Sequence, residues 1–416
     1  MFWQTFSFSD RLFQTNTPRF FKQGATVIPS FSFKTLPQIH FGSGRFNELP
    51  DFISRYGNRV LVILGGESFI KSGHWPILQT ALKAKNDLLA VEHVRGEPSP
   101  ETVDSIASRY REQAIDIILA IGGGSVIDAG KAISAMLMEG GEVERFLEGI
   151  GSEKPSGRKV PFIAVPTTSG TGSEATSNAV LTRTGNQGFK RSLRHDNYIP
   201  DIALVDPALT LSCPRDLTIA CAMDTFSQLV EAYLSNHASP FTDALAFDGL
   251  RAVQRSLRAV CNEGNNLSAR TDMAYAALVS GIVLANAGLG IIHGFASAIG
   301  GFLPIPHGVI CGTLMAAGNR VTLSRLRRTN ENPVALEKYS RLGHLFSQTD
   351  RLSATSCQEL FIAELEQLTG ELTMPTLGHY GIDESHLEAI LDQSGNKYNP
   401  AILDREEMRS ILRQRL

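Results

Sequence analysis

The sequence predicts an α/β domain with a mainly parallel sheet, followed by an all-α domain. Three observations support this prediction. The chain has 416 residues, too many for one ordinary hydrophobic core. From about residue 35 to Pro207, short apolar runs alternate with segments of helical spacing, which is typical of βαβ units. Beyond that point the chain shows helical periods and no convincing strand. We therefore expect a domain boundary near residue 210, with domains over 35–210 and 211–416.

The first domain contains five apolar runs that we expect to be buried strands. Strands that alternate with helices imply a mainly parallel sheet with right-handed crossovers. Two of the intervening helices are clear from their spacing, at Thr102–Gln113 and Val126–Met138. The expected strands are Val60–Leu64, Leu88–Val91, Asp116–Ile121, Phe162–Val165 and Ile202–Val205.

The second domain is predicted to be helical throughout. Its run from Met273 to Asn319 contains no Asp, Glu, Lys or Arg, so most of it must be buried. The part from Ala274 to Ile292 is long enough to cross a membrane. Its Gly and Ala content, and the absence of a flanking Lys/Arg asymmetry, favour a central helix of a globular domain instead. Other clear helical periods are Pro214–Leu234, Thr242–Val260, Thr271–Ala287, Pro333–Ser347 and Arg405–Leu416.

The composition excludes several classes of protein. Hydrophobic residues make up 43% and charged residues 19%, as in a soluble globular protein. A net charge of −3 and the lack of a Lys/Arg-rich run argue against nucleic-acid binding. Five scattered cysteines without a CxxC pair indicate free thiols in a reducing cytoplasm.

Residues 1–34 form an N-terminal extension rich in Phe, Ser and Thr, with four basic residues against one acid. This composition resembles that of a transit peptide. The stretch has no apolar core and no clear cleavage site, however, so we favour an ordinary, poorly ordered N-terminus.

A glycine-rich loop follows the third expected strand and precedes a helix. Glycines let the backbone approach a ligand closely, and a helix N-terminus offers free N–H groups that suit a pyrophosphate. Asp128 would lie in the first turn of that helix. A tight strand–helix turn without a ligand is the alternative. The loop residues are Gly122, Gly123, Gly124 and Ser125.

A second loop, Pro166–Glu174, follows the fourth expected strand and is rich in hydroxyl groups. Hydroxyls and exposed amides bind phosphate or ribose oxygens. Open α/β sheets bind ligands at the carboxyl ends of their strands, which favours this reading over a merely solvated loop. The pattern differs from GxGxxG, so the loop alone does not name a cofactor. Its candidate contacts are Thr167, Thr168, Ser169, Thr171 and Ser173.

The uncharged run carries two histidines, His293 and His307, each followed by glycine. A buried imidazole needs a hydrogen-bond partner or a metal to offset its lost hydration. Asp224 and Gln228 are four residues apart on a predicted apolar helix and therefore share one face. Asp224, His293 and His307 together would make a three-ligand metal site with an open position. Satisfied core histidines, and an Asp paired with a buried Arg, are the alternatives.

These motifs together resemble the iron-containing alcohol dehydrogenase family. They cover nearly the whole chain after residue 35. The resemblance implies a Rossmann-like nucleotide-binding domain and a helical domain, the dehydroquinate synthase-like two-domain fold, with the site in the cleft between them. The stretches that carry it are Gly122–Asp128, Pro166–Glu174, Val205–Pro207, Ala222–Asp224, His293–Gly294 and Pro306–Gly308.

The resemblance also implies cofactors and partners. It implies NAD(P) at the two loops and a divalent metal, Fe2+ with Zn2+ as the alternative. The substrate would be a small alcohol or aldehyde, and the enzyme a homodimer or higher homo-oligomer. Neither nucleic acid nor a membrane is an expected partner.

The sequence departs from the family pattern at two positions. The family motif usually reads Asp-x-x-x-His, and its second position here is Gln228, whose amide oxygen is a weaker donor for late divalent ions. The family often has a further histidine four residues after the first, and that position is Ser297 here. We keep Gln228 as a fourth candidate metal ligand and expect Ser297 or a water to relay the proton.

The expected reaction is reversible hydride transfer between an alcohol and the nicotinamide, with the metal as Lewis acid. Gly65, Gly66 and Ser68 follow the first expected strand and resemble the NADP-using pattern, whereas Glu67 would repel a 2′-phosphate, so NAD and NADP both stay open. A dehydroquinate-synthase or glycerol-dehydrogenase type of enzyme, and a decayed nucleotide-binding homologue, are the alternatives.

Overall fold

The computed structural model describes residues 28–85, 87–185, 188–347 and 352–416. The chain divides into Met1–Phe31 and Ser32–Leu416, and all helices and strands described below belong to the second unit. Most of the predicted N-terminal extension, residues 1–27, lies outside the described residues.

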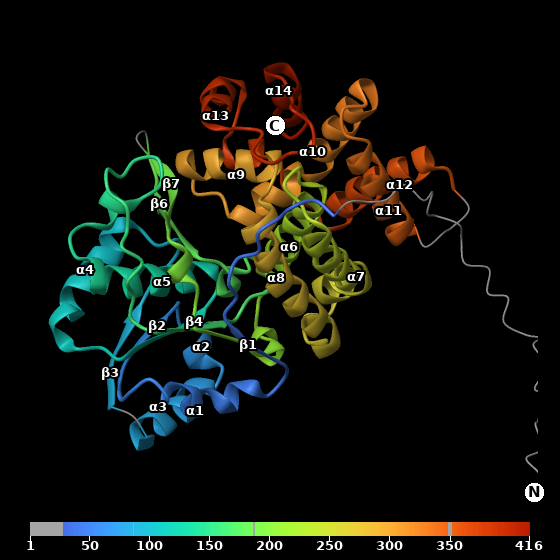
Figure 1. Ribbon diagram of the computed structural model, residues 1–416. Helices are drawn as coiled ribbons and strands as arrows, with labels where there is room; N and C mark the ends of the chain where they lie inside the picture. Colours follow the sequence, from blue (N-terminus) through green and yellow to red (C-terminus); the bar gives the residue numbers. More distant parts are fainter. Residues whose placement is uncertain (1–27, 86, 186–187, 348–351) are drawn as a thin grey trace, which may run out of the picture. The chain divides into compact units, whose positions relative to one another are not determined.

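Six parallel strands form the main sheet, in the order β1-β8-β5-β4-β2-β3 (Figure 1). All five predicted strands are present within a few residues of their expected ends. The short edge strand β1 was not predicted. The strands are β1 (Gln38–Phe41), β2 (Arg59–Leu64), β3 (Asp87–His93), β4 (Ile117–Gly122), β5 (Phe162–Pro166) and β8 (Ile202–Val205).

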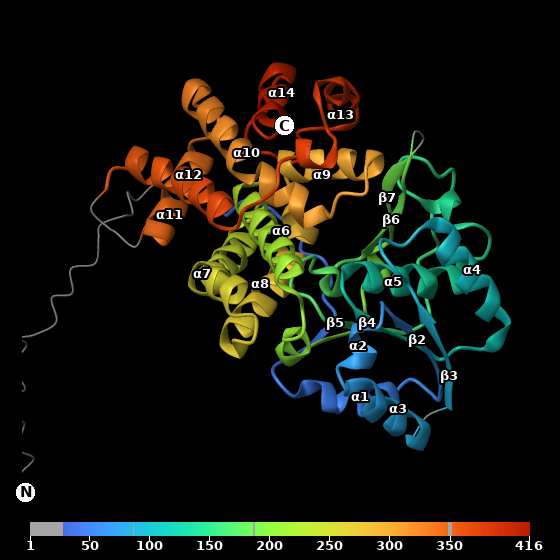
Figure 2. The ribbon, with the colours of Figure 1, turned by 180° about the vertical axis from the view of Figure 1, so that it is seen from behind.

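Both faces of this sheet are covered by helices. In β2, Leu61 and Ile63 face the helices α4 and α5, while Val60 and Val62 face α1 and α3. Figure 2 shows these two helix pairs on opposite sides of the strands. This arrangement explains why the strands read as continuous apolar runs. The helices of this half are α1 (Leu49–Ile53), α2 (Ser68–Lys71), α3 (His74–Lys85), α4 (Pro100–Tyr110) and α5 (Gly124–Glu139).

An antiparallel hairpin, β6 (Asn178–Arg183) with β7 (Phe189–Arg194), lies outside the main sheet. The sequence analysis did not predict it. Strand β7 packs against helix α9 (Ile291–Phe302) of the helical half, where Gly301 lies against the Phe189 backbone and Gly300 against the Lys190 side chain. The hairpin therefore carries side chains from the α/β half to the helices.

After Val205 the described residues are helical, as predicted. Good capping residues start several of these helices. For example, Ser239 and Thr242 form a capping box around Pro240 at the start of α7. The remaining helices are α6 (Arg215–Leu234), α7 (Pro240–Asn262), α8 (Leu267–Ala287), α10 (His307–Thr329), α11 (Pro333–Ser347), α12 (Ala354–Glu371), α13 (Leu387–Gln393) and α14 (Arg405–Arg413).

The predicted helix Thr271–Ala287 is present as most of α8, but the prediction that one central helix continues to Ile292 is wrong. Helix α8 ends at Ala287, and α9 leaves at 98° after Gly288, whose φ of 70° is in the left-handed region. Among the described residues no single helix has the length and apolarity to cross a membrane, although the bent α8–α9 pair would pass on length and composition alone.

The α/β half and the helical half touch backbone to backbone. Gly172, in the hydroxyl-rich loop after β5, lies directly against Gly281 in the middle of α8. A Cβ atom on either glycine would collide with the other residue's backbone. Gly172 also has φ +64°, so both the close approach and the conformation require glycine here. The hydroxyl-rich loop is thereby held against the helical half.

Candidate active site

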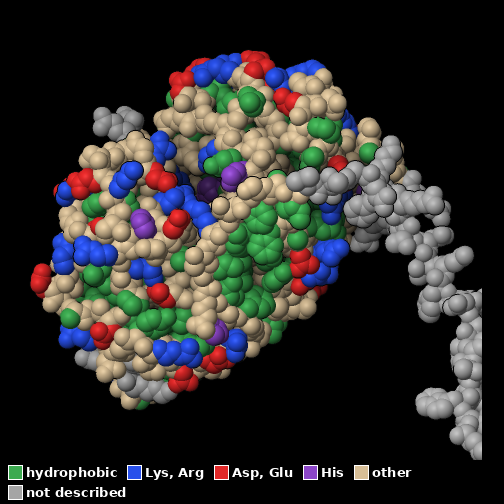
Figure 3. Space-filling view, viewed as in Figure 1, with side chains coloured by type: hydrophobic (Ala, Val, Ile, Leu, Met, Phe, Trp, Pro, Cys, Tyr) green, Lys and Arg blue, Asp and Glu red, His purple; other side chains and the backbone are tan. Residues whose placement is uncertain are grey.

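A cavity of about 1310 Å³ lies where the two loops face the helical half. Figure 3 shows this hollow, with histidine side chains inside it and Lys or Arg side chains at its edge. Seventeen of the eighteen predicted site residues line the cavity. They are Gly65, Gly66, Ser68, Gly122, Gly123, Gly124, Ser125, Asp128, Thr167, Thr168, Thr171, Ser173, Asp224, Gln228, His293, Ser297 and His307.

Ser169 is the exception, because it does not line the cavity. Its carbonyl oxygen accepts a hydrogen bond from the Thr225 hydroxyl at 3.2 Å. The Ser169 hydroxyl is buried and has no hydrogen-bond partner among the described residues. This geometry places Ser169 against helix α6, below the surface that the other loop residues form.

The two predicted phosphate loops pack directly on each other. Gly123 is the N-cap of α5, and Gly124 is its first residue. A Cβ atom on Gly124 would collide with the Thr171 side chain of the second loop, and one on Gly123 would lie 3.3 Å from the Thr168 hydroxyl. Glycine therefore lets the hydroxyls lie beside the free N–H groups of the α5 N-terminus, which is the arrangement that suits an anion.

Lys131 holds the second loop in place from below. Its ammonium group donates to the Ser173 carbonyl at 2.9 Å and the Asn178 carbonyl at 2.7 Å. Asp128, 3.7 Å away, accepts a hydrogen bond from the Val180 amide at 3.1 Å. Burial lowers the pKa of Lys131 to about 8, although the charge of Asp128 opposes that shift. The pair thus joins α5 to the hydroxyl loop and to β6.

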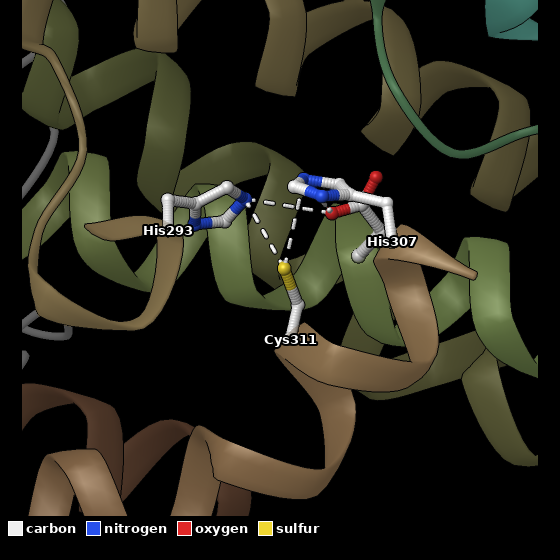
Figure 4. Close-up of side chains that lie close together, drawn as sticks. His293, His307 and Cys311 are labelled. Atoms are coloured by element: carbon white, nitrogen blue, oxygen red, sulfur yellow. Dashed lines mark hydrogen bonds and ion pairs between the residues drawn. The ribbon is translucent and has the colours of Figure 1, made fainter. Parts of the chain in front are cut away.

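Across the cavity, four metal-ligating side chains converge: Asp224, His293, His307 and Cys311. One ligand atom from each lies within 4.8 Å of all the others. The Asp224 carboxylate is 3.4 Å from His293 Nε2 and 3.8 Å from His307 Nε2. The Cys311 sulfur is 3.6 Å and 3.7 Å from the same two nitrogens. Figure 4 shows both imidazoles and the thiol pointing toward one another. The predicted histidine–aspartate cluster is therefore present, with a cysteine added.

The electrostatics of this cluster suit a cation. Asp224 is 3% exposed, and its Oδ1 has no hydrogen-bond partner among the described residues. Burial acts to raise the pKa of Asp224, but His307 and His293 outweigh it and the pKa falls below its usual value. Burial lowers the pKa of His307 to about 4, so its imidazole is neutral at pH 7 and can act as a ligand. Burial acts to lower the pKa of His293, but Cys311, Asp224 and Glu231 outweigh it and raise the pKa well above its usual value. A divalent metal held by this carboxylate, the two imidazoles and the thiol would take the place of that proton.

Glu231 fixes the orientation of His293. It lies seven residues after Asp224 on α6, and its Oε2 is 2.6 Å from His293 Nδ1. A carboxylate oxygen accepts, so Nδ1 donates this hydrogen bond and Nε2 faces the cluster. The other carboxylate oxygen accepts from the Ile292 amide at 2.7 Å, at the start of α9.

Gln228 and Ser297 line the cavity but have other partners. The Gln228 amide oxygen accepts a hydrogen bond from the Ser280 hydroxyl at 2.6 Å. The Ser297 hydroxyl donates to the His293 carbonyl at 2.8 Å and accepts from the Lys397 ammonium at 3.2 Å. Metal ligation by Gln228 and proton relay by Ser297 both stay predictions.

Cys311, Glu231 and Lys397 were not predicted from the sequence. Two of them carried a usable signal. Cys311 is four residues after His307, and Glu231 is seven after Asp224, so each shares a helical face with a predicted ligand. Lys397 lies in the loop between α13 and α14, where no periodicity points to the cavity.

A parallel α/β half with two loops that suit an anion, facing a buried aspartate–histidine cluster in a helical half, is an arrangement typical of a nucleotide- and metal-dependent oxidoreductase. Comparison with known protein families identifies the family of this oxidoreductase. Residues 37–207 match the family model described as iron-containing alcohol dehydrogenase, and residues 218–416 match its C-terminal counterpart. The chain belongs to the iron-containing alcohol dehydrogenase family and is an NAD(P)-linked, metal-dependent alcohol dehydrogenase.

Relatives and solved structures agree with this assignment. Long-chain-alcohol dehydrogenase 1 of Geobacillus thermodenitrificans is 31% identical over 356 residues, which cover 85% of this chain and 87% of that protein. The 1,3-propanediol dehydrogenase of Citrobacter freundii is 32% identical over 88% of this chain and 95% of its own. The crystal structure of a 1,3-propanediol oxidoreductase superposes with a TM-score of 0.81 at 28% identity, covering 93% of this chain and all of that one.

Proposed function

We propose that the enzyme interconverts a small alcohol and its aldehyde or ketone in the cavity between the two loops and the Asp224 cluster. The observation that carries this proposal is the unpartnered Asp224 oxygen, which faces His293, His307 and Cys311 across the cavity from the anion-binding loops. The loops would hold NAD(P), which supplies or accepts the hydride, with its pyrophosphate at Gly123 and Gly124.

The metal ligands in this proposal are Asp224, His293, His307 and Cys311. When bound there, a divalent cation supplies Lewis-acid chemistry at the substrate oxygen. In the family motif, the residue four positions after Asp224 on α6 would be a second metal ligand. Here that residue is Gln228, which is bonded to Ser280, and we propose that Cys311 is the ligand in its place. The family favours Fe2+, whereas a thiolate in the ligand set favours Zn2+, so the two metals are tested side by side.

The chain's own residues would prepare the site in three ways. Glu231 holds His293 in the tautomer that leaves Nε2 free. The neutral state of His307 keeps its ring available as a ligand. Ser297, in contact with the His293 carbonyl and with Lys397, would pass the alcohol proton toward the open side of the cavity.

Gly65, Gly66 and Ser68 line the end of the cavity after β2, where the adenosine ribose would lie. The Glu67 carboxylate pairs with Lys71 at 2.6 Å and does not line the cavity. Glu67 therefore gives no obstacle to a 2′-phosphate, and both NADH and NADPH belong in the assay.

The test uses His293→Ala and His307→Ala, with His386→Ala as a control because His386 pairs with Asp383 in a surface turn. The two site variants should lose bound metal and aldehyde reduction while they still bind NADH or NADPH. The control should keep all three properties. Stoichiometric oxidation of NADH by aldehyde supports a dehydrogenase, whereas turnover without net oxidation would indicate a lyase. Full activity of wild-type enzyme after complete metal removal would overturn the proposal.

We also propose a cytoplasmic homodimer or higher homo-oligomer. Five free cysteines support a reducing compartment, and the family resemblance supports the assembly. Cell fractionation and light scattering of the purified protein test the two statements separately.

A further inference from the structure

Five cationic side chains line the cavity, and three of them have carboxylate partners. These three salt bridges are Lys34–Asp196 at 3.0 Å, Lys190–Glu97 at 2.5 Å and Arg194–Glu148 at 2.7 Å. The other two cations, Arg191 and Lys397, have no carboxylate within salt-bridge distance among the described residues. Neither of these two charges is therefore paired in a salt bridge within the described part of the chain.

Lys397 lies at the metal end of the cavity. Its ammonium group donates to the His293 carbonyl at 3.1 Å and to the Ser297 hydroxyl at 3.2 Å. An ammonium has three N–H donors, so one stays available to a ligand. The backbone of Lys397 has φ 47°, an uncommon left-handed conformation for a residue with a side chain, and such conformations cluster at functional sites.

Arg191 reaches the same region from β7, the strand that packs against α9. Its Nε is buried and has no hydrogen-bond partner among the described residues. Helix α9 carries His293 and Ser297, the two residues that Lys397 contacts. Arg191 and Lys397 both line the cavity, and an anion bound between them would be attracted by both cations.

The phosphates of the nucleotide do not account for these charges. The pyrophosphate is expected at Gly123 and Gly124, in the loop between β4 and α5. There the α5 N-terminus provides its N–H groups. Lys397 instead contacts the residue that supplies a metal ligand, and the substrate oxygen must lie next to that ligand. A second anion, on the substrate itself, fits this position.

We propose that the substrate is a small aldehyde or alcohol that carries an anionic group, such as a carboxylate, sulfonate or phosphonate, bound by Lys397 and Arg191. This inference rests on the proposed function, because it names the substrate class of the same cavity. Arg would bind the planar or tetrahedral anion through its fork of N–H donors, and Lys397 would add a single charged donor. The anion would then orient the carbonyl toward the Asp224 cluster.

The test compares matched substrates on the holoenzyme. Glyoxylate and 4-oxobutanoate are assayed against their methyl esters, which keep the aldehyde but lose the charge, and sulfoacetaldehyde and phosphonoacetaldehyde distinguish the kinds of anion. We expect kcat/KM for at least one anionic aldehyde to exceed that of its neutral counterpart by about 10- to 100-fold, the loss typical of one hydrogen bond to a charged group. The preference should decrease as salt concentration rises.

Lys397→Met and Arg191→Met should each remove most of this preference, mainly through KM for the anionic aldehyde. Arg255→Met is the matched control, because Arg255 pairs with Asp272 and does not line the cavity. As a measurement without turnover, succinate and monomethyl succinate are titrated into wild-type enzyme with NAD+, where tighter binding of succinate supports the proposal. Equal or better use of the neutral aldehydes would overturn the anionic inference alone. A lack of NADH oxidation with every aldehyde would overturn the proposed function as well.

Discussion

The Glu231 carboxylate accepts a hydrogen bond from His293 Nδ1 at 2.6 Å, in the interior of the helical half. Both side chains are buried. Helix α6 thus supplies a candidate ligand, Asp224, and two turns later the carboxylate that orients another ligand on a different helix. Because Glu231 also accepts from the Ile292 amide, it fixes the start of α9 and the imidazole ring together.

Glu231→Gln should weaken metal binding by about 10- to 100-fold, the usual effect of removing a carboxylate that orients a metal-binding histidine. The amide keeps its size but can also donate, so it no longer selects the His293 tautomer. Competition with a chelator measures the metal affinity. Glu364→Gln, whose carboxylate pairs with Arg258 outside the cavity, is the control. An unchanged metal affinity in Glu231→Gln would show that His293 needs no such support.

Cys311→Ser should remove a thiolate ligand. In the Co2+-substituted enzyme, we expect wild type to show a near-ultraviolet charge-transfer band from sulfur to cobalt, and the variant to lose it. Zn2+ affinity should fall more than Fe2+ affinity, because the soft donor is gone. Cys261→Ser, which changes a buried cysteine of α7 outside the cluster, should keep the band. A band that persists in Cys311→Ser would exclude Cys311 as a ligand.

Gln228→His should tighten metal binding if the new imidazole turns from Ser280 into the cavity that Gln228 lines. An imidazole is a stronger donor than an amide for late divalent ions. Metal content after dialysis against chelator is the measurement. Equal metal retention in the variant and wild type would mean that position 228 stays directed at Ser280.

Gly124→Ala should weaken NADH or NADPH binding, because the added Cβ would collide with Thr171 and push the two loops apart. Gly370→Ala is the matched control, since nothing lies within 4 Å of a Cβ at that position. Fluorescence titration of the reduced nucleotide gives the affinity of both variants. If both bind as wild type does, the packed loops are not the nucleotide site.

The sequence predicted the strands and the main helices because both faces of the sheet and most helices bury long apolar patterns. It also located His293 and His307, because they lie in a run without Asp, Glu, Lys or Arg. Asp224 was found because it is a carboxylate on a predicted apolar helix. It missed the β6–β7 hairpin, whose second strand, Phe189–Arg194, is rich in cations that face the cavity and so lacks an apolar alternation. Lys397 could not be found either, because only the folded chain brings its loop to His293.

The same limit applies at Gly288, where a helical pattern continued across a sharp bend. Local spacing is compatible with one long helix there, and the bend depends on tertiary contacts. A Cβ on Gly288 would strike the Tyr398 ring, and Glu231 binds the first amides of the new helix. Neither contact is visible in a periodicity.

Glu174→Gln should make folding stability less dependent on pH. Burial raises the pKa of Glu174 to about 7 from an ordinary value of 4.5. The folded protein therefore binds the extra proton between these values, and the stability present below pH 4.5 is lost as pH rises to about 7. The free energy of unfolding of the variant, relative to wild type, should rise across this window by on the order of 3 kcal/mol. Denaturant titrations at pH 4.5 and pH 8 measure it.

Glu359→Gln is the control for this comparison, because Glu359 lies on the surface and pairs with Arg327. Its difference from wild type should change less between pH 4.5 and pH 8 than that of Glu174→Gln. A constant difference for Glu174→Gln would mean that the buried carboxyl titrates normally.

The contact between Gly172 and Gly281 has a mechanical consequence for the enzyme. No side chain separates the two backbones there, so the two halves are in direct backbone contact and cannot move closer together at that point. A side chain at either position would push the hydroxyl-rich loop away from α8 and so change the width of the cavity that this loop lines.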